Sequence, residues 1–415
     1  MSDYNNNYGD WQPYDNQQHE EKPPEYGQQN DYNGGYRQYD SRPPYENQPP
    51  YGGRQNNFYG GTPPYGFQNI VPHEKWNSER RILKRMSMAA AAGILLYIVF
   101  SGIFSAVLQY ATLMMSMSDT FDYEAFRTIW NSADMQSLIS MLYSILFVGG
   151  AFFIVYLCTR NRGIRYNFPM GKPKHAKYLP VIILAGLGIC LVGNIVTSYV
   201  DMILEALFGV EITSSTQTVS QEPGGIFLIF LSTAVVPALV EEIALRGIVM
   251  QPLRRYGDWF AILCSAMIFA LMHCNLVQIP FAFIAGVVIG YAVITTESIW
   301  TGVLIHFANN AFSVIVSLVA DKYGYSSAQY AACNIAFYAL IIIGIACAFI
   351  YVRLIHNEPL KKYPFINKSR NMIAPHPYYS AVVSNGSLFK TYVLTVPMII
   401  ALLAVAYETT LALIY

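Results

Sequence analysis

Long apolar runs separated by short polar stretches make up the chain from Met88 onward. Nine runs are long enough, or nearly so, to cross a bilayer core of about 30 Å at about 1.5 Å per residue. Backbone exposed to lipid must satisfy its own hydrogen bonds, so each run predicts a helix. The predicted helices are 88–115, 137–158, 178–206, 226–252, 259–274, 277–295, 299–320, 331–352 and 391–413. We therefore expect an all-α, polytopic transmembrane bundle of about eight to nine helices, with the fifth segment the weakest because it is short.

Residues 1–75 follow a different pattern, rich in Tyr, Asn, Gln, Gly and Pro and almost without aliphatic side chains. Such a segment buries too little apolar surface to offset chain entropy, which predicts a disordered tail. Its PPEY string, 23–26, matches a WW-domain ligand pattern, although chance is the commoner source of so short a match in this composition. Self-association and contact with cell-surface polymer are equally open, so the tail's partner is unknown. The first apolar run lies far from the N-terminus, so we expect it to serve as the targeting signal, without a cleavable leader.

Composition agrees with a membrane protein: 53% of residues are hydrophobic and 13% are charged. A formal net charge of zero argues against a nucleic-acid partner and leaves membrane lipid and membrane-embedded substrates as the expected partners. Six cysteines lie in or beside apolar runs without paired C-x-x-C spacing. This pattern favours small buried hydrophobes over a zinc knuckle or a disulfide framework.

Basic residues gather in alternate loops, which predicts the orientation of the chain. The basic positions are Arg80, Arg81, Lys84, Arg85, Arg160, Arg162, Arg165, Lys172, Lys174, Lys177, Arg254, Arg255, Arg353, Lys361, Lys362, Lys368 and Arg370. In a nine-span arrangement these loops share one side, which the positive-inside rule places in the cytoplasm. Acidic residues occupy the opposite loops: Asp119, Asp122, Glu124, Asp134, Glu211 and Glu222. We expect a cytoplasmic N-terminus and an external C-terminus in an integral membrane protein, with a bacterial cell membrane the expected location.

Three charges lie within the fourth apolar run, in the stretch VPALVEEIALRG, 236–247. Ionisable residues inside a membrane cost about 2.5 to 3.5 kcal/mol each, which makes them candidates for function. Glu242 and Arg246 are four residues apart on one helix face, so they are predicted to form an ion pair. Glu241 is turned by about 100° and stays free to accept a proton. The alternative is that all three only hold the fold together.

Two histidines lie in apolar runs, His273 at the end of FALMH and His306 at the start of HFANN. Asn310 follows His306 by one helical turn on the same face. We expect depths of about 20 Å for Glu241, 21 Å for His273 and 10 Å for His306 from the cytoplasmic helix ends, and a tilt or a kink at Pro237 would reduce the first. The spread lies within the error of predicted helix ends, so the sequence permits these side chains to converge.

One carboxylate, two imidazoles and an amide in a membrane cavity suit peptide hydrolysis. The carboxylate and a histidine can deprotonate water, directly or through a metal, while His and Asn can donate hydrogen bonds to a tetrahedral oxyanion. No serine or cysteine is evidently coupled to these groups and H-E-x-x-H is absent, which argues against serine-type and zincin-type mechanisms.

Three motifs on successive predicted helices combine these residues: Glu241-Glu242-x-x-x-Arg246, Phe269-x-x-x-His273 and His306-x-x-x-Asn310. In order and spacing they resemble the signature of the CPBP family of intramembrane proteases, which includes CAAX prenyl endopeptidases and bacteriocin self-immunity proteins. The resemblance covers about 180–352, within a membrane bundle expected at 80–352. The tail, a basic cytoplasmic loop at 353–390 and an extra C-terminal transmembrane helix at 391–415 lie outside it.

The resemblance implies a role for each motif residue: Glu241 with His273 for activation of the attacking water, Glu242 and Arg246 for bracing, and His306 and Asn310 for the oxyanion. The family is often labelled metalloprotease, and Glu241, His273 and His306 form a candidate zinc set. A water mechanism using glutamate and histidine needs no metal, so the cofactor is either zinc or none.

The implied substrate is a peptide or membrane protein within the bilayer, prenylated or not. A non-catalytic immunity or scaffold protein is the alternative function. A proton-coupled transporter carries less weight, because no inverted repeat or second acidic cluster is visible.

Overall fold

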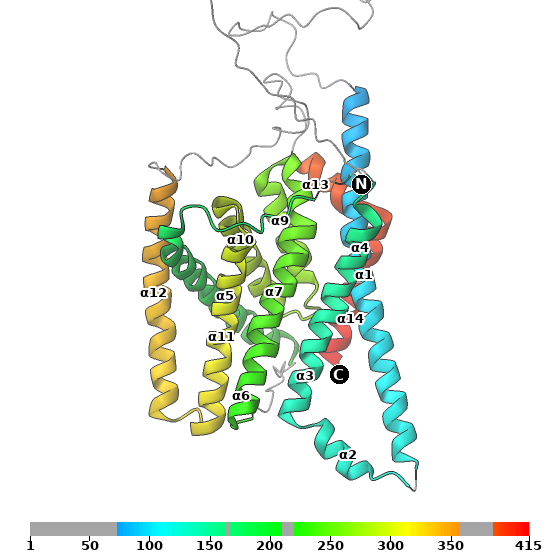
Figure 1. Ribbon diagram of the computed structural model, residues 1–415, viewed down its shortest axis with the longest axis vertical. Coiled ribbons are helices and arrows are strands. Elements are labelled where there is room, and N and C mark those ends of the chain that lie inside the picture. Colours follow the sequence, from blue (N-terminus) through cyan, green and yellow to red (C-terminus); the bar gives the residue numbers. More distant parts are fainter. Residues whose placement is uncertain are drawn as a thin grey trace, which may run out of the picture. The chain divides into compact units, whose positions relative to one another are not determined.

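The computed structural model describes residues 73–118, 120–162, 164, 166–209, 220–356 and 385–414. Nearly all of the predicted tail, including the PPEY string, and most of the predicted basic loop lie outside these ranges. Among the described residues every regular element is helical, which confirms the all-α prediction. The elements, shown in Figure 1, are α1 (His73–Ser116), α2 (Tyr123–Trp130), α3 (Ala133–Tyr143), η1 (Ser144–Gly149), α4 (Gly150–Thr159), η2 (Ala176–Tyr178), α5 (Leu179–Phe208), α6 (Pro223–Ile229), η3 (Phe230–Val235), α7 (Val236–Glu242), η4 (Ile243–Met250), α8 (Gln251–Leu253), η5 (Arg254–Tyr256), α9 (Asp258–Leu271), α10 (Gln278–Thr296), α11 (Ile299–Tyr323), α12 (Ala328–His356), α13 (Asn385–Val393) and α14 (Val396–Ile414).

Seven helical stretches of the described chain are long and apolar enough to cross a membrane, which makes this an integral membrane protein as predicted. They are Ser78–Ser116, Ala133–Thr159, Ala176–Leu207, Pro223–Tyr256, Gln278–Thr296, Ile299–Tyr323 and Ala328–Leu354. The fifth predicted segment is α9, whose 14 residues rise only about 21 Å, less than the bilayer core. The chain turns back after α9 because Cys274 adopts a left-handed conformation (φ 47°) and Asn275 Oδ1 accepts the backbone N–H of Val277.

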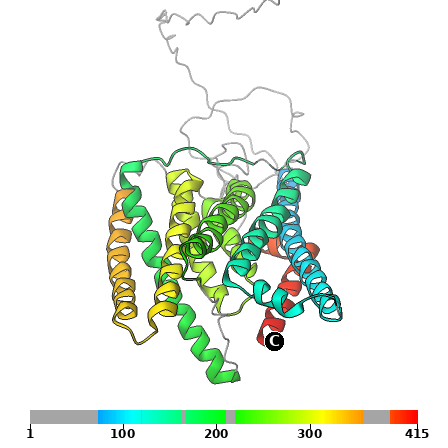
Figure 2. The same ribbon diagram turned by 60° about the horizontal axis from the view of Figure 1, so that its bottom comes forward.

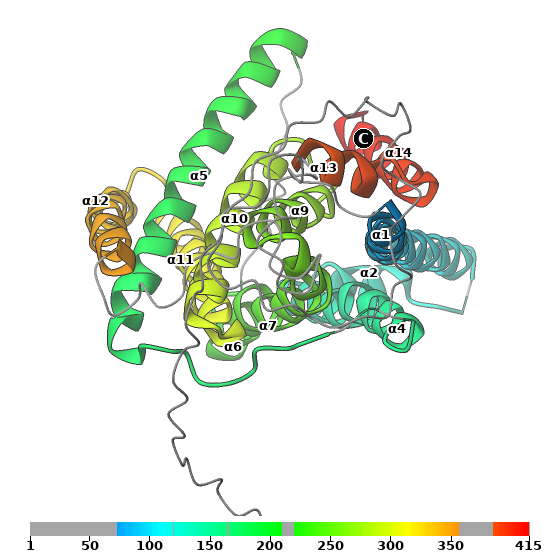
Figure 3. The same cartoon turned by 90° about the horizontal axis from the view of Figure 1, so that it is seen from above.

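The ninth predicted segment also differs from expectation. In place of one helix over 391–413, helices Gly386–Val393 and Val396–Ala412 meet at a bend of 74°. Pro397 lies in the first turn of α14, where its missing N–H costs no intrahelical bond. Ser87 on α1 hydrogen-bonds the Tyr392 carbonyl and the Thr395 hydroxyl, so the bend is attached to the first membrane helix. Figure 3 shows α13 and α14 beside α1. The pair counts as an eighth span at most.

The described basic loops meet at one end of the bundle. Lys174 N–H donates to the Thr296 carbonyl, and Ile299 N–H donates to the Pro169 carbonyl. Arg255 forms an ion pair of 2.7 Å with Glu79, which lies before the first apolar run. The loops after α4, η5 and α10 therefore share an end with the start of α1, as the loop charges predict.

Pro237 does not end the helix, because Pro223–Tyr256 runs as a single span, but it interrupts the regular α-helical hydrogen bonding. The interruption is absorbed by wider π-helical turns, η3 before Pro237 and η4 after Glu242. In η3 the Val236 N–H bonds to the Leu231 carbonyl, five residues earlier. Such π-helical turns are frequent at functional sites.

Helices α5 and α12 cross in close contact and lie side by side in Figures 1 and 2. A Cβ atom placed on Gly188 would lie 2.5 Å from the Gly344 Cα, so only glycine permits this approach. Small residues allow close packing of membrane helices, where van der Waals contact supplies much of the association energy.

We expect Gly188→Ala to lower stability by about 1 to 3 kcal/mol, because backbone must move to admit the methyl group. The matched control is Gly102→Ala, since a Cβ on Gly102 meets nothing within 4 Å. Both changes raise helix propensity alike. Thermal unfolding in detergent should show a loss for the first variant only, and equal behaviour would contradict the close α5–α12 contact.

Candidate active site

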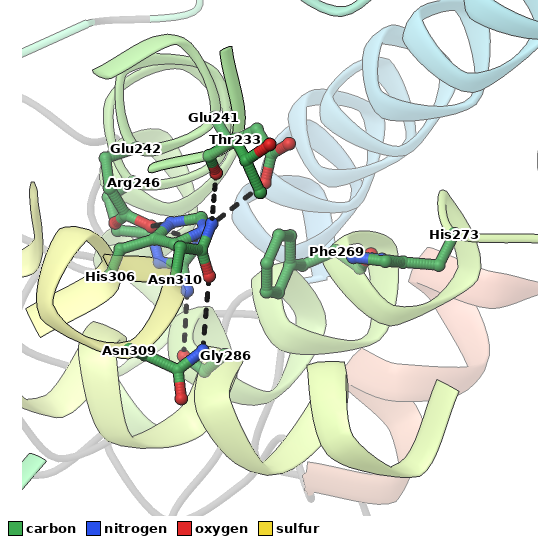
Figure 4. Close-up of polar contacts among 10 residues, drawn as sticks. All are labelled: Thr233, Glu241, Glu242, Arg246, Phe269, His273, Gly286, His306, Asn309 and Asn310. Carbon is green, nitrogen blue, oxygen red and sulfur yellow. Dashed lines mark hydrogen bonds and ion pairs between the residues drawn. The ribbon is translucent and has the colours of Figure 1, made fainter. Parts of the chain in front are cut away.

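A cavity of about 460 Å³ opens between the α1, α3, η1 and α5 side of the bundle and the motif-bearing helices. Four predicted site residues line it: Glu241, His273, His306 and Asn310. They come from α7, the turn after α9, and α11. The convergence that the sequence only permitted is thus present, although Figure 4 shows His273 apart from the others, beyond the Phe269 ring.

Glu242 and Arg246 lie behind this cavity and form the predicted ion pair. Arg246 Nη1 is 3.2 Å from Glu242 Oε1, and both side chains are 0% exposed. Arg246 Nη2 also donates to the Gly286 carbonyl on α10 at 3.3 Å, and its guanidinium carbon lies 4.9 Å from the centre of the Phe269 ring on α9. The buried arginine therefore ties α9 and α10 to the glutamate pair, and the bracing role implied by the resemblance fits this geometry.

Gly302 allows α11 to approach the ion pair. A Cβ atom at this position would lie 2.8 Å from Glu242 Oε2 and 2.7 Å from Val293 Cγ2. His306 follows Gly302 by one turn, so the same helix face presents its ring to Glu242. Because Gly302 has no side chain, His306 lies within hydrogen-bonding distance of the buried Glu242 carboxylate.

We expect Gly302→Ala to cost about 1 to 3 kcal/mol of stability through overpacking, and to weaken activity by displacing His306. Gly150→Ala is the control, because a Cβ there contacts nothing within 4 Å. The measurements are thermal unfolding in detergent and substrate cleavage. A variant as stable and as active as the control would show that α11 can move away without consequence.

His306 stands between the two glutamates. Its Nδ1 lies 3.1 Å from Glu242 Oε1, and its Nε2 lies 3.8 Å from Glu241 Oε2. A carboxylate only accepts hydrogen bonds, so Nδ1 carries a proton, and Nε2 is the ring nitrogen that faces Glu241. A separation of 3.8 Å is too long for a direct hydrogen bond, and both residues line the cavity.

His273 lies in the turn after α9, not within a helix as its motif predicts. Its Nδ1 is 2.9 Å from the Phe269 carbonyl, which only accepts, so Nδ1 is again the protonated nitrogen. Histidine commonly caps the last carbonyls of a helix in this way. The Phe269 ring packs edge-on against both imidazoles, with centroids 5.0 Å from His273 and 5.9 Å from His306. Of the two histidines, His306 is the one in ion-pair range of Glu241 within the described chain.

Asn310 is held by a backbone carbonyl close to Pro237. Proline has no N–H, so residue 237 donates to neither carbonyl in helical range, Ser232 or Thr233. Asn310 Nδ2 donates to the Thr233 carbonyl at 3.0 Å, as Figure 4 shows. Asn309 Nδ2 donates in turn to Asn310 Oδ1 at 3.2 Å. The Asn310 amide is thereby oriented with a second N–H still available.

Sequence reasoning missed the residues on the opposite wall of the cavity. Tyr97 on α1 and Tyr143 on α3 line it, with their hydroxyls 3.1 Å apart. Ser101 Oγ lies 2.6 Å from the Tyr143 hydroxyl. Tyrosines within apolar runs give no local signal, because their relation to Glu241 exists only after α1 and α3 pack against α7.

Glu241, His273 and His306, the candidate zinc ligands, are not arranged as a metal site in the described chain. Among the described residues, no group of three or more His, Cys, Asp or Glu side chains is arranged to hold a metal ion. Glu241, His273 and His306 therefore do not fit a shared metal here, and no proposed chemical step passes through one.

The segment that contains these site residues matches a known protein family. Residues 223–312 match the family model described as Type II CAAX prenyl endopeptidase Rce1-like. The match runs from α6 into α11 and contains every predicted site residue from Glu241 to Asn310. No curated protein and no solved structure matches the chain. The resemblance expected from the three motifs is confirmed for this segment.

Proposed function

We propose that the protein is an intramembrane endopeptidase that hydrolyses a peptide bond of a membrane-embedded substrate. The observation that carries the proposal is the approach of Glu241 Oε2 to His306 Nε2, 3.8 Å apart beside a cavity of about 460 Å³. The Rce1-like match over 223–312 supports a protease of this class.

Water activation is the first proposed step. A water between Glu241 Oε2 and His306 Nε2 donates one hydrogen to each, which turns an oxygen lone pair towards the substrate. As the oxygen attacks the scissile carbonyl, Glu241 takes the proton and later delivers it to the leaving amine. Glu242 stabilises His306 by accepting its Nδ1–H, and Arg246 offsets the charge of Glu242. In this scheme His306 replaces His273 as the partner of Glu241.

Oxyanion stabilisation falls to the Asn310 amide. One N–H of Asn310 is fixed on the Thr233 carbonyl, so the second has a defined direction and can donate to the developing negative charge. A preoriented donor is worth more than a mobile one, because no reorganisation is needed during the reaction. His273, on the rim of the same cavity, is assigned to substrate positioning.

The expected substrates are a CAAX-type prenylated peptide or an unprenylated transmembrane peptide. We assign the basic end of the bundle to the cytoplasm by the positive-inside rule, and we propose a bacterial cell membrane as the location. In this arrangement the break between α9 and α10 and the Glu241 region lie within the membrane, where a polar cavity can admit both peptide and water.

Reconstitution in liposomes tests the proposal directly. Purified protein is incubated with a prenylated C-terminal peptide and, separately, with transmembrane peptides, and new chain ends are identified by mass spectrometry. Cleavage by the wild type that disappears on substitution of Glu241 supports the hydrolase. Folded wild-type protein that cleaves neither class would favour the immunity or scaffold alternative.

A further inference from the structure

A second cavity, of about 550 Å³, lies on the outer side of α1 and α4, away from the residues of the candidate active site. We call it the α1–α4 groove. Its lining includes Arg85, Ala92 and Leu96 from α1, and Ile154, Cys158 and Arg162 from α4 and the loop after it. Arg85, Cys158 and Arg162 are exposed, and Ile154 is 40% exposed, so the groove opens towards the lipid.

The groove is charged at one end and apolar at the other. Arg85 and Arg162 lie at the basic end of the bundle, where Arg85 Nη1 donates to the Arg162 carbonyl at 3.2 Å. Leu96 lies eleven residues further along α1, about 16 Å deeper at the rise of an α-helix. Ile154 likewise lies deeper than Arg162, because α4 runs towards the basic end and ends at Thr159. Polarity therefore changes along the groove as it does along a phospholipid.

Within the described chain, these two arginines lack the carboxylate partners that their neighbours have. At the same end Arg254 pairs with Asp258 at 2.7 Å, Arg255 with Glu79 at 2.7 Å, and Lys174 with Glu297 at 2.8 Å. Among the described residues, none of the ion pairs includes Arg85 or Arg162, and no Asp or Glu lines the groove. Two positive charges without a carboxylate partner in the described ranges, at the level of the headgroups, favour binding of an anion.

We propose that the α1–α4 groove is a binding site for an anionic phospholipid. The phosphate and acidic headgroup contact Arg85 and Arg162, and an acyl chain lies along Ala92, Leu96 and Ile154. Arginine pairs with phosphate oxygens through two parallel N–H donors, which favours a phosphate headgroup over a diffuse surface charge. A lipid held here bridges α1 and the end of α4, two elements outside the 223–312 match.

Native mass spectrometry of the full chain tests this site. The protein is titrated with dioleoyl phosphatidylglycerol and, separately, with dioleoyl phosphatidylcholine, which has the same chains but no net charge. We expect about tenfold tighter binding of the anionic lipid by the wild type, and loss of that preference in Arg85→Gln/Arg162→Gln. The matched control is Arg81→Gln/Arg160→Gln, which removes two exposed arginines of the same end that do not line the groove.

Two further arms separate the groove from general electrostatics and from a simple anion site. Ala92→Phe fills the apolar part while both arginines stay, so it should weaken lipid binding and leave any binding of inorganic phosphate unchanged. Equal loss of preference in both arginine pairs would overturn the proposal, since that is general surface charge. Displacement of the lipid by millimolar inorganic phosphate, or an unaffected Ala92→Phe, would also overturn it.

Discussion

Glu241→Gln should abolish peptide cleavage and leave the fold intact. The amide keeps the shape of the side chain but cannot accept the proton of the attacking water, and loss of a general base typically costs about 10²- to 10⁴-fold in rate. The Glu241 side chain is 19% exposed at the cavity and forms no part of the buried Glu242–Arg246 pair. We therefore expect the loss in kcat, with little change in KM or in thermal stability.

The matched control for this variant is Glu222→Gln, which changes an exposed carboxylate next to α6 in the same way. Cleavage by the control should equal that of the wild type. If Glu241→Gln cleaved the substrate at an undiminished rate, the assignment of the base would be wrong, and contamination or another residue would account for the activity.

Arg246→Met should have the largest effect on stability, about 3 to 5 kcal/mol. Removal of the guanidinium leaves the Glu242 charge buried, with 0% exposure and with His306 Nδ1 as its remaining described partner. The methionine chain fills much of the space of the arginine while the guanidinium contact with the Phe269 ring is lost with the charge, so the loss reports on charge more than on volume. Thermal unfolding in detergent, with yield of folded protein as a second readout, measures the effect.

The double variant Glu242→Gln/Arg246→Met distinguishes charge from packing. It removes both charges, and the glutamine oxygen can still accept the His306 Nδ1–H, so we expect most of the lost stability to return. A double variant no more stable than Arg246→Met alone would show that the arginine stabilises the site by its shape or by its bond to Gly286, and not by neutralising Glu242.

The Glu242–Arg246 pair could be predicted because both residues lie on one helix, four positions apart. The contact between His306 and Glu242 could not, because it depends on α11 approaching over Gly302, and a single sequence does not show which helices meet. The three motifs indicated a shared site but not which histidine faces Glu241. That choice depends on the turn at Cys274, which ends α9 before His273.

The predicted helix boundaries are wrong where the backbone departs from a regular α-helix. Asn275 and Pro397 are ordinary turn and helix-start residues, yet hydropathy alone carried the fifth segment three residues past Leu271, to 274, and ran straight through 395. The π-helical turns around α7 have the same origin, because Pro237 changes the hydrogen-bond pattern without changing the hydropathy. The fourth membrane span is present as predicted. The altered turns within this span set the directions in which its side chains point.

The bond from Asn310 to the Thr233 carbonyl makes Pro237 and Asn310 an interdependent pair. Asn310→Leu removes a donor from the Thr233 carbonyl, while Pro237→Ala supplies a backbone N–H within helical range of the same carbonyl, in competition with the amide. With both changes together, the new backbone N–H can take the place of the amide. Selection for folding should therefore accept the two substitutions jointly more readily than singly, whereas selection for catalysis should retain both original residues. Covariation of positions 237 and 310 among related chains would thus report whether a given relative keeps its amide for chemistry.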